Sequence, residues 1–76
     1  MSRIIPVHWK ILECIFVKFG FEFKRHEGSH RSYVKHGINR PIIIPTYKSV
    51  DAEIIRSNMR TACMTRTKYF ELLAKC

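Results

Sequence analysis

Residues 20–33 read GFEFKRHEGSHRSY. Across residues 21–26 successive side chains fall on alternate faces, and this period of two is typical of a β-strand. Gly28 and Ser29 supply the turn chemistry of a tight reversal, and residues 30–36 then resume a strand-like pattern. The segment therefore predicts a β-hairpin.

The segment before this hairpin has the periodicity of an amphipathic helix. Apolar residues recur at steps of four across residues 7–19, which places them on one helical stripe. Pro6 suits the first turn of a helix, where its missing N–H costs nothing, and Gly20 suits the end of one. The expected stripe contains Val7, Ile11, Ile15 and Phe19.

The segment after the hairpin predicts one more strand and two helices. Residues 41–45 form a β-branched run between two prolines, which favours a short third strand. Ser49 or Asp51 can cap a helix that runs to about Ala62, and Thr65 can cap a final short helix. The order α-β-β-β-α-α predicts an α+β fold, in which helices cover one face of a three-stranded antiparallel sheet. This order of elements resembles a double-stranded RNA-binding domain.

Composition predicts a small folded domain with a polyanionic partner. A chain of 76 residues is too short for two cores, so residues 1–76 are expected to form a single domain. Fourteen Lys and Arg residues against six Asp and Glu residues give a net charge of +8. A nucleic acid or an acidic protein fits such a surface, although the same excess of charge also keeps a small protein soluble.

The three cysteines, at positions 14, 63 and 76, are odd in number and widely spaced. This pattern suits neither a disulfide framework nor a zinc site, so we expect Cys14 and Cys63 to be core thiols and the protein to be cytoplasmic. No apolar run approaches the roughly 20 residues that a membrane span needs, and no signal peptide is recognisable. We therefore expect no membrane association.

The hairpin segment resembles the signature of the HicA toxin family. The shared pattern is a helix ending in Gly20-Phe21, a strand reaching Arg25, a Gly-Ser turn, and a histidine, His30, that opens the next strand. Residues 42–45, followed by a helix containing residues 55–57, resemble the second characteristic region of the family in the same order. The resemblance spans nearly the whole chain.

This resemblance implies an RNA endonuclease that inhibits translation by cutting messenger RNA and is silenced by a HicB-like antitoxin. It assigns the essential histidine of the family to His30. The chemistry is compatible, because RNA supplies its own nucleophile in the 2′-hydroxyl and histidine can accept or donate a proton near neutral pH. Such a scheme needs no metal and no cofactor, and the carboxylates show no spacing that suits magnesium.

Seven further residues are expected to contact the RNA substrate. The basic side chains would hold phosphate oxygens and offset the charge that develops during cleavage. The two turn residues would allow close approach or donate a hydrogen bond, although a purely conformational role serves as well, and Tyr47 would stack on RNA or pack at the hinge. Alternation separates Arg31 and Lys35 from His30 on their strand. The predicted set is Lys24, Arg25, Gly28, Ser29, Arg31, Lys35 and Tyr47.

Two alternatives remain open at this stage. Many relatives carry Pro-x-His after the third strand, whereas this chain has Pro45-Thr46-Tyr47, which suits a small RNA-binding module that has lost cleavage. An operator-binding protein that uses the last two helices as a helix-turn-helix is disfavoured, because their junction at Cys63-Met64 lacks a turn glycine.

Overall fold

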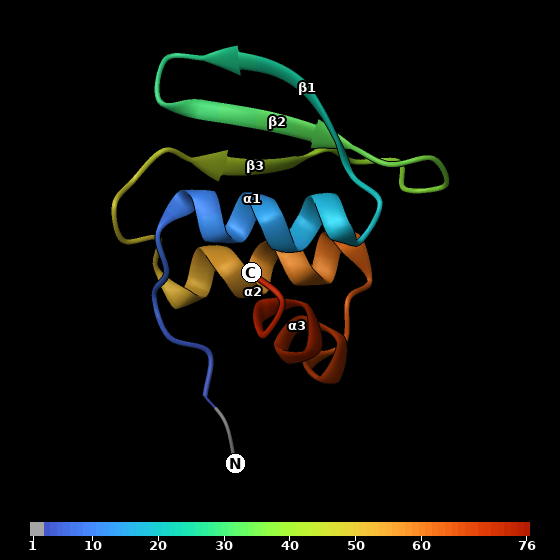
Figure 1. Ribbon diagram of the computed structural model, residues 1–76. Helices are drawn as coiled ribbons and strands as arrows, with labels where there is room; N and C mark the ends of the chain where they lie inside the picture. The colour runs from blue at the N-terminus through green and yellow to red at the C-terminus, as the bar shows by residue number, and fades with distance from the viewer. Residues whose placement is uncertain (1–2) are drawn as a thin grey trace.

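The elements follow one another in the predicted order, α-β-β-β-α-α, which confirms the α+β fold class. The structure is a computed structural model that describes residues 3–76. Its elements are α1 (Trp9–Lys18), β1 (Glu22–Glu27), β2 (His30–Val34), β3 (Ile42–Pro45), α2 (Ala52–Ala62) and α3 (Arg66–Leu73), as Figure 1 shows.

The first helix begins later than the sequence predicts. Residue 7 is not helical, because Val7 exchanges backbone hydrogen bonds with Val50 in an isolated antiparallel bridge. His8 becomes the N-cap instead, and its Nδ1 accepts a hydrogen bond from the Lys10 N–H at 3.1 Å. The predicted end is confirmed, since Gly20 has a φ of 109° that a residue with a side chain rarely adopts.

The sheet is the predicted antiparallel meander, with strand order β1-β2-β3. The register between β1 and β2 shifts between Phe23 and Arg25, so Lys24 occupies a bulge. The second strand ends at Val34, two residues before the predicted end, because the chain turns at His36 and Gly37.

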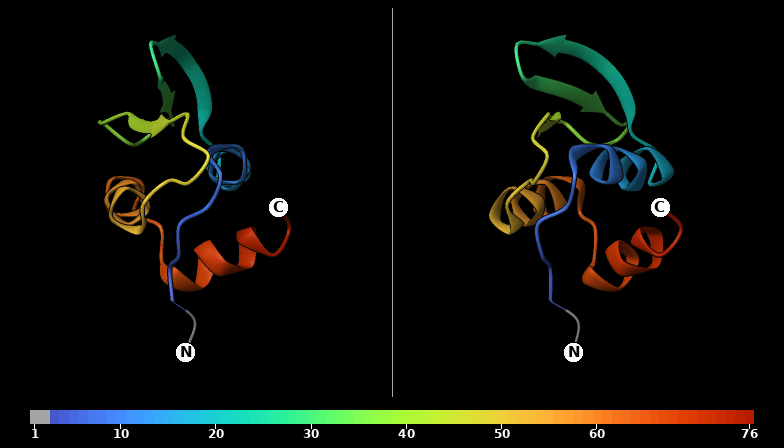
Figure 2. Two further views of the ribbon diagram at one scale, coloured as in Figure 1. Left: turned by 90° about the vertical axis from the view of Figure 1, so that its left-hand side faces the viewer. Right: turned by 60° about the vertical axis from the view of Figure 1, so that its left-hand side comes forward.

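Three layers make up the molecule. Figures 1 and 2 show α1 and α2 side by side beneath the sheet, with α3 on their far side. Tyr33, Ile42 and Ile44 point from the sheet into the core and are at most 1% exposed. Since side chains alternate along a strand, their neighbours in sequence point to the face that the helices leave uncovered, which we call the outer face.

A buried polar contact fixes α2 against the edge of the sheet. Asn58 is 8% exposed, and its Nδ2 donates a hydrogen bond to the backbone oxygen of Ile43 at 3.0 Å. The Asn58 amide thus satisfies a carbonyl on the free edge of β3. The polar residue at this core-facing helix position is therefore explained by its partner.

The prediction that Cys14 and Cys63 are core thiols is wrong. Cys14 forms a disulfide with Cys76, which ties α1 to the residues that follow α3. Cys63 is an exposed thiol at the C-cap of α2, with a φ of 57°. The chain reverses direction at Cys63 without a glycine. The disulfide was not predicted because its two cysteines are 62 residues apart, and no local sequence pattern connects them.

Candidate active site

His30 opens β2 directly after the turn formed by Gly28 and Ser29, and it is exposed to solvent. Gly28 has a φ of 58°, as the first residue of a type II′ hairpin turn requires. A Cβ added at Gly28 would meet no atom within 4 Å, so backbone conformation rather than space requires glycine here. The predicted tight turn therefore presents the imidazole at the tip of a hairpin.

The turn is tied to the end of β3. The Ser29 carbonyl accepts hydrogen bonds from the Thr46 N–H at 2.7 Å and from Thr46 Oγ1 at 3.1 Å. His30 itself is paired with Pro45 in the β2–β3 ladder. The backbone of the histidine is thus held from the β3 side while its side chain remains in solvent.

The outer face brings Arg25 and Glu27 near His30. Residues that pair directly across an antiparallel ladder project their side chains from the same face. Glu27 pairs with His30, and Arg25 pairs with Ser32, one step farther along that face. Arg25 Nε lies 2.7 Å from Glu27 Oε1, and both side chains are 69% exposed.

Glu27 was missed as a site residue by the sequence analysis. The available signal was the length of the turn, because a two-residue turn pairs the residues that flank it. Thr46 was missed as well, since its contact to Ser29 joins residues 17 positions apart. Among the predicted cations, Arg25 is the one that shares the outer face with His30.

Arg31 lies on the opposite, helix-facing side, as alternation indicated, and is engaged in a local network. Its Nε donates to the Tyr33 hydroxyl at 3.0 Å, and its Nη2 donates to Glu13 Oε2 at 3.1 Å. The guanidinium also lies 4.1 Å from the centre of the Phe23 ring and within cation–π reach of Trp9. The hydrogen bond with Tyr33 raises the pKa of Arg31.

Tyr33 completes this network between the sheet and α1. Its hydroxyl donates to Glu13 Oε2. Burial, together with that hydrogen bond, raises the pKa of Tyr33 to about 12. On its helix-facing side, β2 is therefore joined to α1 through Glu13. Arg31 could bind a phosphate only after its hydrogen bond to Glu13 breaks.

Lys35 and Lys24 lie away from the histidine. Lys35 follows the far end of β2, and its Nζ lies 4.1 Å above the Phe19 ring at the end of α1. Lys24 is exposed at the bulge of β1. Both remain predicted RNA contacts, but neither is adjacent to His30 in the pairing register.

Tyr47 lies at the same end of the molecule as His30. It follows Pro45, the β3 partner of His30, by two residues, and its backbone oxygen accepts a hydrogen bond from the Trp9 N–H at 3.1 Å. Its side chain is 46% exposed. The ring can therefore meet a ligand that reaches the hairpin tip.

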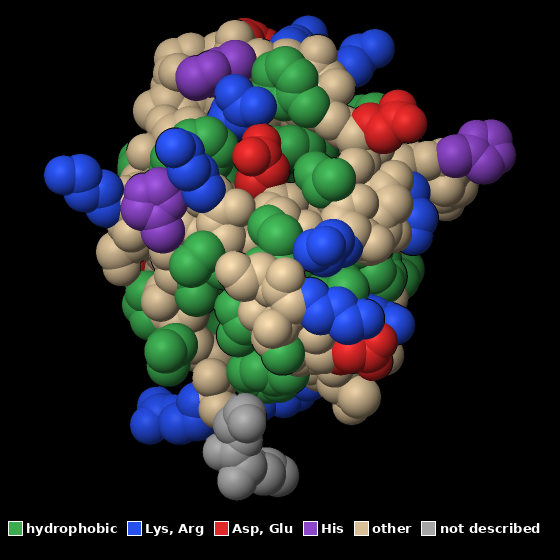
Figure 3. Space-filling view, viewed as in Figure 1, with side chains coloured by type: hydrophobic (Ala, Val, Ile, Leu, Met, Phe, Trp, Pro, Cys, Tyr) green, Lys and Arg blue, Asp and Glu red, His purple; other side chains and the backbone are tan. Residues whose placement is uncertain are grey.

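One face of the molecule is predominantly basic (Figure 3). Figure 3 shows few carboxylates on the face it displays, scattered among more numerous Lys and Arg side chains. Among residues 3–76, no three His, Cys, Asp or Glu side chains gather where they could share a metal ion. Every helix in that part of the chain falls short of what crossing a membrane requires.

Comparison with known families identifies the chain. No curated protein matches it. The family described as "HicA toxin of bacterial toxin-antitoxin" matches residues 9–63, which run from the start of α1 to the C-cap of α2 and include the hairpin. The protein therefore belongs to the HicA toxin family, the toxins of bacterial toxin–antitoxin pairs.

Proposed function

We propose that this protein is an endoribonuclease that cleaves messenger RNA without a metal ion, with His30 as its general acid or base. One observation carries the proposal: a solvent-exposed imidazole stands at the tip of a hairpin that Thr46 ties to the sheet, with Arg25 on the same face. Membership of a toxin family supports it.

The reaction that fits this geometry uses the nucleophile of the RNA itself. The 2′-hydroxyl oxygen attacks the adjacent phosphorus, and the bond from phosphorus to the 5′ oxygen of the next nucleotide breaks. The imidazole either takes the proton of the 2′-hydroxyl or gives a proton to the departing 5′ oxygen, and water serves the other role. The products are a 2′,3′-cyclic phosphate and a 5′-hydroxyl end.

Arg25 is the cation placed to stabilise the reacting phosphate. Its guanidinium shares the outer face with His30, and it can exchange its exposed partner Glu27 for phosphate oxygens at little cost. Turn residues Gly28 and Ser29 would let the RNA backbone approach the imidazole, and Tyr47 would stack on a base.

The proposal includes a protein partner and a location. A HicB-like antitoxin would inhibit the toxin by covering His30, as the resemblance implies. We place the protein in the cytoplasm because the proposed substrate is messenger RNA. The number and spacing of the cysteines no longer support this location, since Cys14 and Cys76 form a disulfide.

The test compares cleavage of messenger RNA by the wild-type protein, His30→Ala and His26→Ala, each in the presence of a chelator. His26 is a matched control because it is exposed, lies on the same hairpin and pairs with Arg31 on the other face. We expect His30→Ala to lose a factor of roughly 10² to 10⁴ in rate, and His26→Ala to retain activity.

A non-catalytic RNA-binding module is the second candidate, because Tyr47 stands where many relatives carry a histidine. RNA that is bound but cut by neither the wild-type protein nor His30→Ala would establish it. Equal cutting by both proteins would exclude His30 as the catalytic residue.

A further inference from the structure

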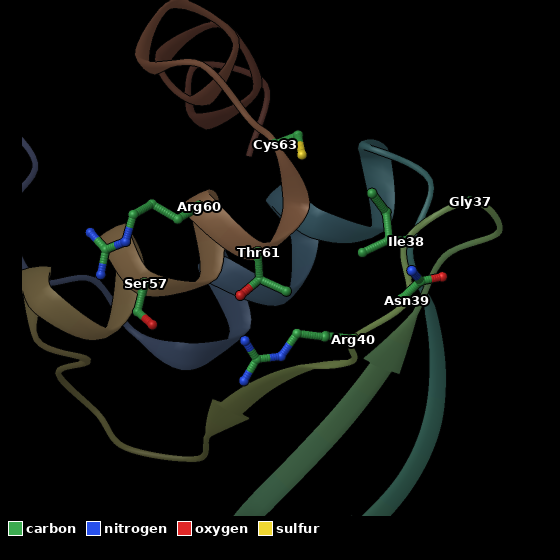
Figure 4. A pocket seen from close by; sticks show the side chains of 8 residues that line it. All are labelled: Gly37, Ile38, Asn39, Arg40, Ser57, Arg60, Thr61 and Cys63. Atoms are coloured by element: carbon green, nitrogen blue, oxygen red, sulfur yellow. The ribbon is translucent and has the colours of Figure 1, made fainter.

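A cavity separate from the hairpin tip lies between α2 and the segment that leads into β3. It has a volume of about 540 Å³, and its polar lining comes from Asn39, Arg40, Ser57, Arg60 and Thr61. Figure 4 shows the Arg40 guanidinium on the same side of α2 as the Ser57 and Thr61 side chains. The space exceeds what one phosphate needs and suits a nucleotide unit.

The lining is rich in donors that suit an anion. Ser57 and Thr61 are four residues apart on α2, so their hydroxyls lie on one helical face, and Arg40 faces them from the chain before β3. A neighbouring cavity of about 370 Å³ continues along α2 past Glu53 and Arg56. Along this surface three arginines accompany a single carboxylate.

These arginines are available to a ligand. Within residues 3–76 the ion pairs are Arg25–Glu27, Arg31–Glu13 and Lys68–Glu71, and none includes Arg40, Arg56 or Arg60. All three are exposed. A guanidinium with five N–H donors and no carboxylate partner is well suited to bind phosphate oxygens in pairs.

The position of the cavity relates it to the hairpin tip. His30 begins β2, and Gly37 to Arg40 follow its far end, so one strand of five residues, roughly 15 Å, separates the two places. The bond from Asn58 to Ile43 holds α2 beside β3. An extended polyanion lying along this side can reach both places.

We propose that this cavity is an accessory subsite that binds a backbone phosphate and its nucleotide, a few nucleotides away from the bond cleaved at His30. This inference rests on the proposed function, because it takes RNA as the ligand. An RNA strand fits better than an acidic peptide, because a nucleotide fills the volume and the Asn39 amide offers both a donor and an acceptor to a base edge.

The experiment measures the binding of a short fluorescent single-stranded RNA to His30→Ala protein, which keeps cleavage out of the measurement. The test variant adds Arg40→Gln and Arg60→Gln. A matched control adds Lys18→Gln and Lys75→Gln, which remove the same charge from exposed positions on α1 and near the C-terminus. Circular dichroism verifies that all the variants are folded.

We expect the Arg40→Gln/Arg60→Gln variant to bind RNA at least about tenfold more weakly. The slope of log affinity against log salt should become shallower by about 0.7, because the subsite binds one phosphate and each contacted phosphate of a single strand contributes about 0.7. The lysine control should retain the slope of the parent protein.

Equal weakening by the two double variants would show a general charge effect and overturn the subsite. RNA binding unchanged in both, with weaker binding of the antitoxin to the arginine variant, would assign the cavity to an acidic protein segment and would also overturn it. If the His30→Ala parent binds no RNA at all, both this inference and the proposed function fail. The first two outcomes leave the proposed function intact.

Discussion

Glu27 and His30 face each other across the Gly28–Ser29 turn, on the face of the sheet that the helices leave uncovered. A carboxylate at this position repels phosphate, and the Arg25 guanidinium that contacts it also lies next to the site. The Glu27 carboxylate therefore competes with the RNA phosphate for Arg25. RNA must either displace Glu27 from Arg25 or bind beside an Arg25 whose charge Glu27 neutralises.

Replacing Glu27 by Gln should tighten RNA binding severalfold. The change removes a repulsive charge and frees Arg25, while the free energy of unfolding should change by less than about 1 kcal/mol because the pair is exposed. Glu71→Gln is the control, since Glu71 also forms an exposed ion pair, with Lys68 on α3. Binding of RNA to both variants in the His30→Ala background is the measurement, and weaker binding to Glu27→Gln would contradict the competition.

Gly28→Ala should destabilise the hairpin and slow cleavage. Its φ of 58° strains any residue with a Cβ, and the cost is about 1 to 2 kcal/mol. Because no distant part of the fold lies near the added Cβ, the loss comes from the local backbone conformation and not from a clash with another segment. Ser29→Ala retains the carbonyl that Thr46 uses and should change stability by at most about 0.5 kcal/mol. Urea unfolding and cleavage rates of the two variants measure the difference, and equal stability would show that the turn tolerates a side chain.

Alkaline unfolding should reveal the buried Tyr33 hydroxyl. Its pKa is 10.0 in the unfolded reference and about 12 in the folded protein, so folding favours the protonated form. This contribution to stability is fully present below pH 10 and is lost as the pH rises from 10 towards 12. Tyr33→Phe should therefore lose less stability than the wild-type protein across that interval. Burial also raises the pKa of Tyr69, but this effect is common to both proteins and cancels in the comparison. The measurement is the free energy of unfolding of the wild-type protein and of Tyr33→Phe as a function of pH, and parallel profiles for the two proteins would contradict the prediction.

Local periodicity was sufficient to predict the elements and their order. The alternation after Phe21, the turn at Gly28 and the cap at Thr65 each depend on residues that are close in sequence. The Thr65 side chain accepts the Lys68 N–H at 3.1 Å, as a cap should. The exposed position of His30 follows from the same local pattern.

Contacts between residues that are far apart in sequence could not be predicted from local periodicity. The start of α1 depends on Val7 pairing with Val50, and the environment of Arg31 depends on Glu13, 18 residues earlier. No local pattern encodes either partner. The candidate site was therefore predicted at its turn and its histidine, whereas the contacts of its neighbouring cations required the structure.

Opening the disulfide between Cys14 and Cys76 should release α3 from α1. The bridge closes a loop across 62 residues, and a cross-link of that span typically stabilises a small protein by about 2 to 4 kcal/mol. The family match ends at Cys63, before α3, so the matched region contains the hairpin but not this helix.

Reduction of the disulfide should therefore lower the Tm and expose α3 to proteolysis before it affects the hairpin. A reductant should lower the Tm of the wild-type protein. It should lower the Tm of Cys63→Ser as well, because Cys63 is a free, exposed cysteine outside the disulfide. It should leave the Tm of Cys76→Ser unchanged, because that variant lacks the bond. A reductant-induced shift in Cys76→Ser would show that the stabilising bond is a different one, whereas a loss of RNA cleavage in step with α3 release would show that α3 supports the site.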